Sequence, residues 1–358
     1  MSRFWSSLIH NLTPYTPGEQ PKIDNLIKLN TNENPYGPSP KVIQAIANAN
    51  SESLRKYPDP NASRLKSSIA EYYSEHGITT SNVFVGNSSD EVLAHAFRAL
   101  LKQNKPLLFP DITYSFYPVY CELFEIDFQT VPLRDDYSIN INDFSIENGG
   151  VIFANPNAPT GLAVPITQLE SLLKKHQNSV IIVDEAYIDF AAGEIRSAIE
   201  LVNRFPNILV TQTLSKSRSL AGLRVGMAIG HSDLIEGLER VKNSFHPYAL
   251  DSLALAGASA AFEDKEYFIE CCEKVVQTRI EFTEALDQLG FTTLPSSTNF
   301  VFTSHPKISA KDLFDGLRRN NIIVRYFDKP RLDQHLRISI GTDDEMKQCK
   351  QILEQLVN

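Results

Sequence analysis

Lys216 is the residue of this chain best suited to covalent chemistry. It follows the apolar run 208–210, which is typical of a buried strand, and two glycines, Gly222 and Gly226, come soon after it. A lysine that is desolvated near other cations loses its proton near neutral pH, and the free amine can attack an aldehyde. The alternative is a solvated loop lysine, which is the commoner environment of this residue type. The choice between a reactive lysine and a solvated one depends on which partner residues the rest of the chain supplies.

Polar side chains end two other apolar runs. Asp184 follows the β-branched run 180–183, and a carboxylate there needs a partner because its burial is costly. Asn157 lies between Pro156 and Pro159, which make the turn rigid, at the kind of strand end where open α/β sheets contact ligands. A Walker-B-type magnesium site is the rival explanation of Asp184, but no Gly-x-x-x-x-Gly-Lys-Ser/Thr motif accompanies it. A protonated pyridine nitrogen is a partner that would keep this carboxylate ionised.

A phosphate group would suit two further stretches. Ser88 and Ser89 lie where a helix is expected to begin, and the free N–H groups of a helix N-terminus bind anions. An ordinary N-cap explains the same Ser-Ser-Asp-Glu sequence. Ser215 adds a hydroxyl and Arg224 a planar guanidinium, one on each side of Lys216. A lysine, a buried aspartate and a phosphate cradle together match pyridoxal 5′-phosphate (PLP).

Aromatic and basic residues elsewhere could line a cleft. Tyr57 lies in a turn that two prolines fix, where its hydroxyl could meet an anion or simply pack on the surface. Tyr114 follows a short buried strand and could stack on a planar ring, although core packing is the commoner case. Arg325 and Arg337 each have apolar neighbours and therefore need an anion, from a salt bridge or from a substrate carboxylate or phosphate.

Composition excludes several classes of protein. The 358 residues carry a net charge of −9, so no basic surplus favours nucleic acid as a partner. The four cysteines lack CxxC spacing, and adjacent Cys271 and Cys272 indicate buried helix thiols, a reducing cytoplasm and no zinc site. We expect no signal peptide in residues 1–10, and no apolar run approaches the roughly 20 residues of a membrane span.

Apolar runs near residues 83, 106, 151, 180, 208 and 225 alternate with helical patterns. This alternation predicts an α/β fold with a mostly parallel sheet and right-handed crossovers. After residue 229 long helices and then short strands indicate a smaller α+β unit. We expect a large domain over residues 51–247, and a small domain made of residues 1–50 and 248–358.

The order of Asn157, Asp184, Tyr187, Lys216 and Arg224 resembles that of the fold-type I PLP-dependent aminotransferases. Within that family the chain most resembles the histidinol-phosphate aminotransferases. The stretches that carry the resemblance are 12–15, 32–37, 57–59, 86–91, 155–161, 184–187, 215–224 and 336–342.

The resemblance implies a mostly parallel seven-stranded sheet and a homodimer with shared active sites. It implies catalytic roles for three residues: Lys216 would form the Schiff base, Asp184 would pair with the ring nitrogen, and Tyr187 would donate to the ring oxygen. The other implied cofactor contacts are Asn157 at the ring oxygen, Tyr114 on the ring face, and Ser88, Ser89, Ser215, Arg224 and the second subunit's Tyr57 at the phosphate. The implied substrate contacts are Tyr15, Asn34, Arg325 and Arg337.

The reaction that the resemblance implies is transamination between L-histidinol phosphate and 2-oxoglutarate in histidine biosynthesis. The products would be imidazole acetol phosphate and glutamate. A broad aromatic amino-acid aminotransferase, a phosphothreonine-type decarboxylase and a PLP-binding regulator are the alternatives. Two departures concern the site. Ser88 stands where the family usually has glycine, and Ser-Arg-Ser at 217–219 replaces a small residue and an aromatic.

Overall fold

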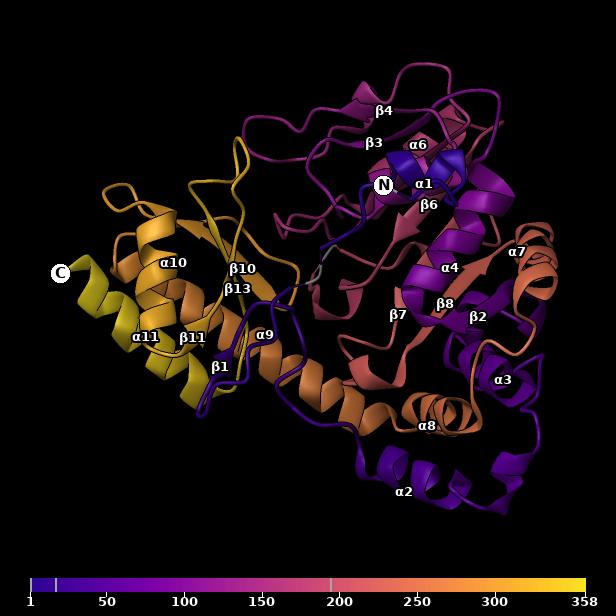
Figure 1. Cartoon of the computed structure of the whole chain (residues 1–358), viewed down its shortest axis with the longest axis horizontal. Helices are drawn as coiled ribbons and strands as arrows, with labels where there is room; N and C mark the ends of the chain where they lie inside the picture. The colour runs from indigo at the N-terminus through magenta and orange to yellow at the C-terminus, as the bar shows by residue number, and fades with distance from the viewer. Residues whose placement is uncertain (1, 17, 194) are drawn as a thin grey trace.

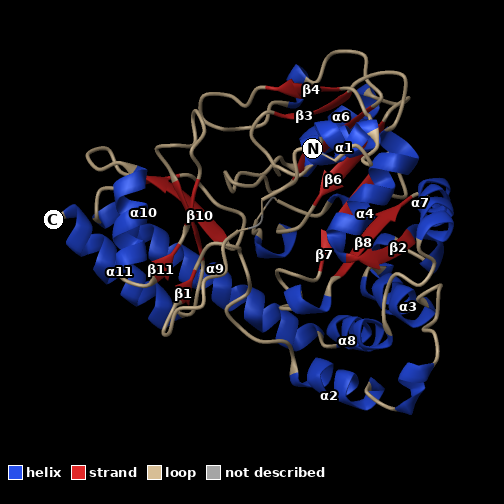
Figure 2. Cartoon of the chain, viewed as in Figure 1, coloured by secondary structure: helices blue, strands red, loops and turns tan. Residues whose placement is uncertain are grey.

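A seven-stranded sheet forms the centre of the larger part of the molecule in this computed structural model, which describes residues 2–16, 18–193 and 195–358 (Figures 1 and 2). The strand order is β2-β8-β7-β6-β5-β3-β4, and only β8 runs antiparallel to its neighbours. The strands are β2 (Val83–Asn87), β3 (Leu107–Pro110), β4 (Phe128–Val131), β5 (Gly150–Ala154), β6 (Val180–Asp184), β7 (Ile208–Thr213) and β8 (Val225–Gly230). The expected mostly parallel α/β sheet is confirmed.

Helices cover both faces of this sheet because its inner strands bury side chains on both sides. Along β6, Ile181 and Val183 join one apolar cluster, whereas Ile182 joins the cluster on the opposite face. The helices of this part are α1 (Ser7–Asn11), α2 (Pro40–Ala49), α3 (Ser63–Tyr72), α4 (Ser88–Ala96), α5 (Tyr117–Phe124), α6 (Ile166–Lys175), α7 (Ser232–Phe245) and α8 (Ser252–Glu263).

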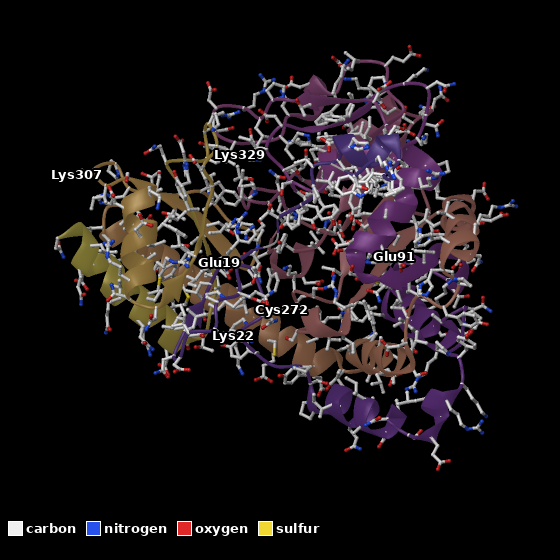
Figure 3. All side chains as sticks on the ribbon, viewed as in Figure 1. Glu19, Lys22, Glu91, Cys272, Lys307 and Lys329 are labelled. Carbon is white, nitrogen blue, oxygen red and sulfur yellow. The ribbon has the colours of Figure 1, made fainter. Side chains whose placement is uncertain are left out.

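A smaller unit follows the long helix α9 (Lys265–Gln288), on which Cys272 is labelled in Figure 3. Its four-stranded sheet has the order β12-β13-β10-β9. Two-residue β1 (Ile27–Lys28) pairs in parallel with β11 (Ile322–Ile323), so the N-terminal segment packs with the C-terminal unit. The remaining elements are β9 (Thr292–Thr293), β10 (Phe300–Ser304), α10 (Ala310–Arg319), β12 (Arg325–Tyr326), β13 (Leu336–Ser339) and α11 (Asp343–Val357).

The packing of α2 and α8 bears on the expected domain division. Val42 of α2, together with Ala254 and Phe262 of α8, lies in the apolar cluster beneath the large sheet. Both helices nevertheless belong to the segments that we assigned to the small domain, 1–50 and 248–358. We therefore propose a revised division, in which α2 belongs to the large unit and the boundary lies near Asp264, between α8 and α9.

Candidate active site

The predicted cofactor residues meet at one edge of the large sheet. The carboxyl ends of parallel β5, β6 and β7 lead directly to Asn157, Asp184 and Lys216. Antiparallel β8 begins at this same edge, so Arg224 just before it faces the end of β2 and the start of α4. Chain direction alone therefore brings together residues that are more than 100 positions apart.

Asp184 is a buried carboxylate with two hydroxyl donors. Tyr117 Oη donates to Asp184 Oδ2 at 2.9 Å, and Thr211 Oγ1 donates to Oδ1 at 3.2 Å. Burial raises the pKa of Asp184 to about 6, although both hydrogen bonds lower it. A cation beside this carboxylate would restore its ionised form, which is the environment that a protonated ring nitrogen offers.

This raised pKa predicts a pH-dependent stability for the cofactor-free protein. Between an ordinary pKa of 3.8 and the folded value of about 6, the folded state keeps a proton that the unfolded state loses. The stability from Asp184 therefore falls as the pH rises through this interval. The free energy of unfolding of Asp184→Asn, relative to that of wild type, should therefore rise by about 1 kcal/mol between about pH 5 and about pH 7.

Urea unfolding of both proteins at the two pH values measures this difference. The contributions of the other titrating groups cancel, because both proteins contain them. A constant difference between the two proteins would contradict the assignment. Adding PLP should abolish the gain, because a positive ring nitrogen lowers the pKa of Asp184.

A loop near the N-terminus spans the site and contacts a different functional residue at nearly every position. Lys216 Nζ donates to Thr31 O at 2.9 Å, and Arg337 Nη2 donates to Asn30 O at 2.8 Å. The Asn34 amide, predicted to contact substrate, donates to Ser217 O at 3.1 Å. The loop thus ties the predicted covalent lysine to the predicted substrate arginine.

Asn157 follows β5 and Tyr187 follows β6, the strand that ends at Asp184, and both side chains are buried. The Asn157 amide donates to Ile112 O at 2.9 Å and to Thr160 Oγ1 at 3.2 Å, while its oxygen accepts from Thr113 Oγ1. These bonds hold the amide in one orientation, as the rigid turn predicts. Both Asn157 donors are directed at protein atoms, so the ring-oxygen contact proposed for this amide requires sharing or exchanging one of these bonds.

The start of α4 makes a tight backbone cradle with β8. Ser88 has a φ of +70°, which explains why glycine is usual in the family at this position. Its hydroxyl offsets part of that cost by accepting from Asp90 N at 3.2 Å. Glu91, labelled on α4 in Figure 3, accepts from Asn87 N at 2.5 Å and fixes the turn.

Gly226 lies directly against this cradle. A Cβ at Gly226 would lie 2.3 Å from Ser89 N and 2.4 Å from Ser88 C, both of them backbone atoms. We expect Gly226→Ala to push α4 from β8, to cost about 1–3 kcal/mol of stability, and to weaken PLP binding. The matched control is Gly222→Ala, because a Cβ there meets nothing within 4 Å. Urea unfolding and absorbance titration with PLP measure both effects, and equal effects of the two substitutions would contradict the cradle.

The charged and hydroxyl groups expected at the phosphate gather at this cradle. Arg224 Nη2 pairs with Asp90 Oδ2 at 3.1 Å, and Tyr114 Oη donates to Asp90 Oδ1 at 3.0 Å. Buried Ser215 Oγ accepts from Thr213 Oγ1 at 3.0 Å. Tyr57 differs from these groups, because its side chain is 81% exposed and stacks on Tyr248 with the ring centroids 4.6 Å apart.

The predicted substrate arginines face each other across two strands. Arg325 of β12 and Arg337 of β13 are direct cross-strand partners, and Arg337 Nε is buried without a hydrogen-bond partner. Like charges in this register are destabilising. Burial first, and then Arg325, lower the pKa of Arg337, whereas Tyr15 and Tyr187 raise it. An anion between the two arginines would relieve both the repulsion and the unpaired Nε.

Sequence reasoning missed several residues that position the predicted ones. Tyr117 and Thr211 hold Asp184, Asp90 holds Arg224 and Tyr114, and Asn32 holds Tyr187. Thr211 is part of β7, next to Asp184 in the ladder, so strand register could have found it. The others depend on packing that no local pattern reveals.

Arg218 explains the second departure from the family pattern. Its guanidinium lies 4.0 Å from the ring centroids of Phe262 and Phe268, and Nη1 donates to Ala261 O at 2.7 Å. The side chain therefore packs between α8 and α9, where it anchors the turn that carries Lys216.

The site fits PLP on its own geometry. Buried Asp184 would be stabilised in its ionised form by a cation, and the Lys216 amine follows β7 at the same edge of the sheet. The backbone cradle and Arg224 suit a phosphate. Among the described residues, no group of three His, Cys, Asp or Glu side chains could hold a metal ion. This sheet and its edge residues are those of a fold-type I PLP enzyme.

The comparisons with known proteins agree. The model of the family "Aminotransferase class I and II" matches residues 24–354, and the chain belongs to this family. "Histidinol-phosphate aminotransferase 1" of Hydrogenovibrio crunogenus is 59% identical over 357 residues, 100% of this chain and 99% of that protein. "Histidinol-phosphate aminotransferase" of Pseudomonas putida is 57% identical over 349 residues, 98% of each chain.

Solved structures show the same fold. The histidinol-phosphate aminotransferase of Sinorhizobium meliloti, in complex with pyridoxal-5′-phosphate, superposes with a TM-score of 0.88 at 24% identity and covers 100% of this chain and 98% of its own. A putative histidinol-phosphate aminotransferase of Erwinia carotovora has a TM-score of 0.83 at 26% identity, covering 93% and 96%. This chain is therefore an aminotransferase that uses PLP.

Proposed function

We propose that this aminotransferase transfers the amino group of L-histidinol phosphate to 2-oxoglutarate, in histidine biosynthesis. The products are imidazole acetol phosphate and glutamate. The observation that carries the choice of amino donor is the cross-strand pair Arg325 and Arg337, with which no carboxylate of the described residues forms an ion pair. Relatives that share 57–59% of the sequence over nearly its whole length carry the name of this activity.

The residues of the sheet edge divide the chemistry among them. PLP, when bound, supplies an electron sink that stabilises negative charge at the substrate Cα. Lys216 Nζ would hold the cofactor and, as a free amine, would remove the Cα proton of the substrate as a general base. Thr31 O accepts a hydrogen bond from this amine and so orients it. Asp184 would stay ionised beside a positive ring nitrogen, and Tyr187 would donate to the ring oxygen.

Substrate recognition is assigned to the far side of the cleft. Arg325 and Arg337 bind the substrate phosphate, and Tyr15 and Asn34 line the approach. Tyr15 packs on Phe116 at 4.9 Å and interacts electrostatically with both Arg337 and Tyr114, so it lies between the cofactor residues and the arginines. Binding the phosphate removes the repulsion between the two guanidinium groups, which gives a phosphorylated donor an advantage over a neutral one.

A homodimer with shared sites completes the proposal. Tyr57 is highly exposed within its own chain, where it stacks on Tyr248, and this exposure supports a role at the cofactor phosphate of a second subunit. Two further apolar side chains are exposed nearby in sequence: Leu54, close to Tyr57, is 47% exposed, and Phe245, close to Tyr248, is 79% exposed. A second copy of the chain could bury both. We place the enzyme in the cytoplasm. None of the described helices is long and apolar enough to cross a membrane.

A substrate panel tests the assignment of the amino donor. Turnover of L-histidinol phosphate, phenylalanine and O-phosphothreonine is compared in the presence of 2-oxoglutarate. We expect the first to have the highest kcat/KM, because its phosphate supplies the anion that Arg325 and Arg337 need. Negligible turnover of L-histidinol phosphate would overturn the proposal, and phenylalanine as the best donor would favour the aromatic aminotransferase instead.

A further inference from the structure

Asn32 is a buried polar residue on the loop that spans the site. Its backbone has a φ of +57°, a conformation that asparagine tolerates better than most side chains. Asn32 O accepts from Asn299 Nδ2 at 2.9 Å, and Asn32 N donates to Ser339 Oγ at 2.9 Å. Hydrogen bonds therefore hold both the backbone N–H and the backbone carbonyl of Asn32.

These contacts orient the Asn32 side chain. Ser339 Oγ accepts from Asn32 N, so its own hydrogen is free, and it donates to Asn32 Oδ1 at 2.8 Å. The amide oxygen therefore faces Ser339 of β13. The amide nitrogen faces the other way, where Nδ2 donates to Tyr187 Oη at 3.0 Å.

This orientation has a consequence for Tyr187. A phenol oxygen that accepts from an amide has its own hydrogen free to donate elsewhere. Phe300 packs edge-on against the Tyr187 ring at 5.2 Å, which restricts the ring. Arg337 interacts electrostatically with Tyr187, and as a cation it offers no acceptor for the phenol hydrogen. Among the described residues none accepts a hydrogen bond from Tyr187 Oη, so that hydrogen is left for a group bound in the site.

We propose that Asn32 is a positioning residue that sets the hydrogen-bond direction of Tyr187, so that the phenol donates to the ring oxygen of PLP and cannot accept from it. Accepting one hydrogen bond also strengthens the bond that a hydroxyl donates. The inference rests on the proposed role of Tyr187 and adds to it the residue that enforces that role.

The pH titration of the visible absorption of the lysine-bound cofactor reads this hydrogen bond directly. A donor at the ring oxygen favours the form in which that oxygen is more negative, so losing it raises the pH of the transition. Tyr187→Phe should raise the midpoint by about one pH unit or more. Asn32→Gly, which suits the positive φ, should raise it in the same direction by a smaller amount.

The double variant separates positioning from a merely structural effect. In Tyr187→Phe protein, the added Asn32→Gly substitution should leave the midpoint unchanged, because the phenol that it directs is gone. Asn32→Asp serves as a second variant in case the glycine variant binds PLP poorly. Its carboxylate would accept the phenol hydrogen, so it should raise the midpoint at least as far as Asn32→Gly.

Asn30→Ala is the matched control on the same loop. Its buried amide donates to Glu19 O at 3.0 Å, and no hydrogen bond joins it to Tyr187 in the described part of the chain. It should lower stability in urea without moving the midpoint. The proposal is overturned if Asn30→Ala and Asn32→Gly shift the midpoint equally, or if the Asn32→Gly shift persists without Tyr187. If Tyr187→Phe alone has no effect, the role of Tyr187 and this inference both fail, while the donor assignment from the substrate panel stands.

Discussion

Lys216→Ala should lower turnover by about four orders of magnitude or more and abolish the cofactor adduct that borohydride reduction traps. The reason is that one amine serves as both the covalent attachment and the proton carrier. No described residue repeats its position at the end of β7. Mass spectrometry of the reduced protein and single-turnover kinetics measure the two losses.

Lys216→Arg is the sharper comparison. Arginine keeps the positive charge and can still reach Thr31 O, but it stays protonated and does not form a Schiff base. We expect the fold and the affinity for the phosphate group to survive, while the trapped adduct and turnover are lost together. A trapped adduct in either variant would assign the covalent bond to another lysine.

Arg337→Gln should lower kcat/KM for a phosphorylated amino donor by about two to three orders of magnitude. Each charge-assisted hydrogen bond to the phosphate contributes about 1.5–3 kcal/mol, and Arg337 offers more than one donor. Steady-state kinetics with L-histidinol phosphate measures the loss. The control is Arg319→Gln, which removes an exposed arginine of α10 in the same unit and should leave kcat/KM unchanged.

The cross-strand register adds a second readout for these arginines. Arg325 and Arg337 oppose each other, so replacing Arg325 by glutamine relieves a like-charge repulsion in the ligand-free protein. We expect Arg325→Gln to unfold in urea no more easily than wild type, although it binds the phosphorylated donor less tightly. A variant that loses stability but keeps its affinity would show that Arg325 serves the fold rather than the substrate.

Local sequence pattern predicted the parts of the site that sit at strand ends. The β-branched run before Asp184 lies in β6, which ends at Asp184, and the apolar run before Lys216 begins β7, which ends at Thr213. Composition therefore suffices to place both residues at or just after a strand end. The Ser-Ser-Asp-Glu sequence likewise marks the beginning of α4, and the structure starts that helix at Ser88. The apolar runs also located the start of six of the seven strands of the large sheet to within one residue, and only β4 was not expected.

Contacts between residues far apart in the chain could not be predicted from local sequence patterns. Tyr117 reaches Asp184 across 67 positions, and nothing in the local sequence of either residue indicates the pair. The sequence placed α8 in the small domain, and the revised division that we propose depends on a similar long-range contact. Its alanine-rich face suits either unit, and only its packing on α2 and α3 shows which one it covers.

The loop that contains Asn32 is joined to Ser339 by two hydrogen bonds across 307 positions. Closing a chain segment of that length costs about 5 kcal/mol of entropy before either bond forms. Contacts of such high sequence separation form late in folding. During synthesis, Ser339 emerges from the ribosome long after the large sheet is complete. The catalytic site is thus among the last features to be assembled, and a chain that stops before β13 can build the cofactor cradle without building a site that works.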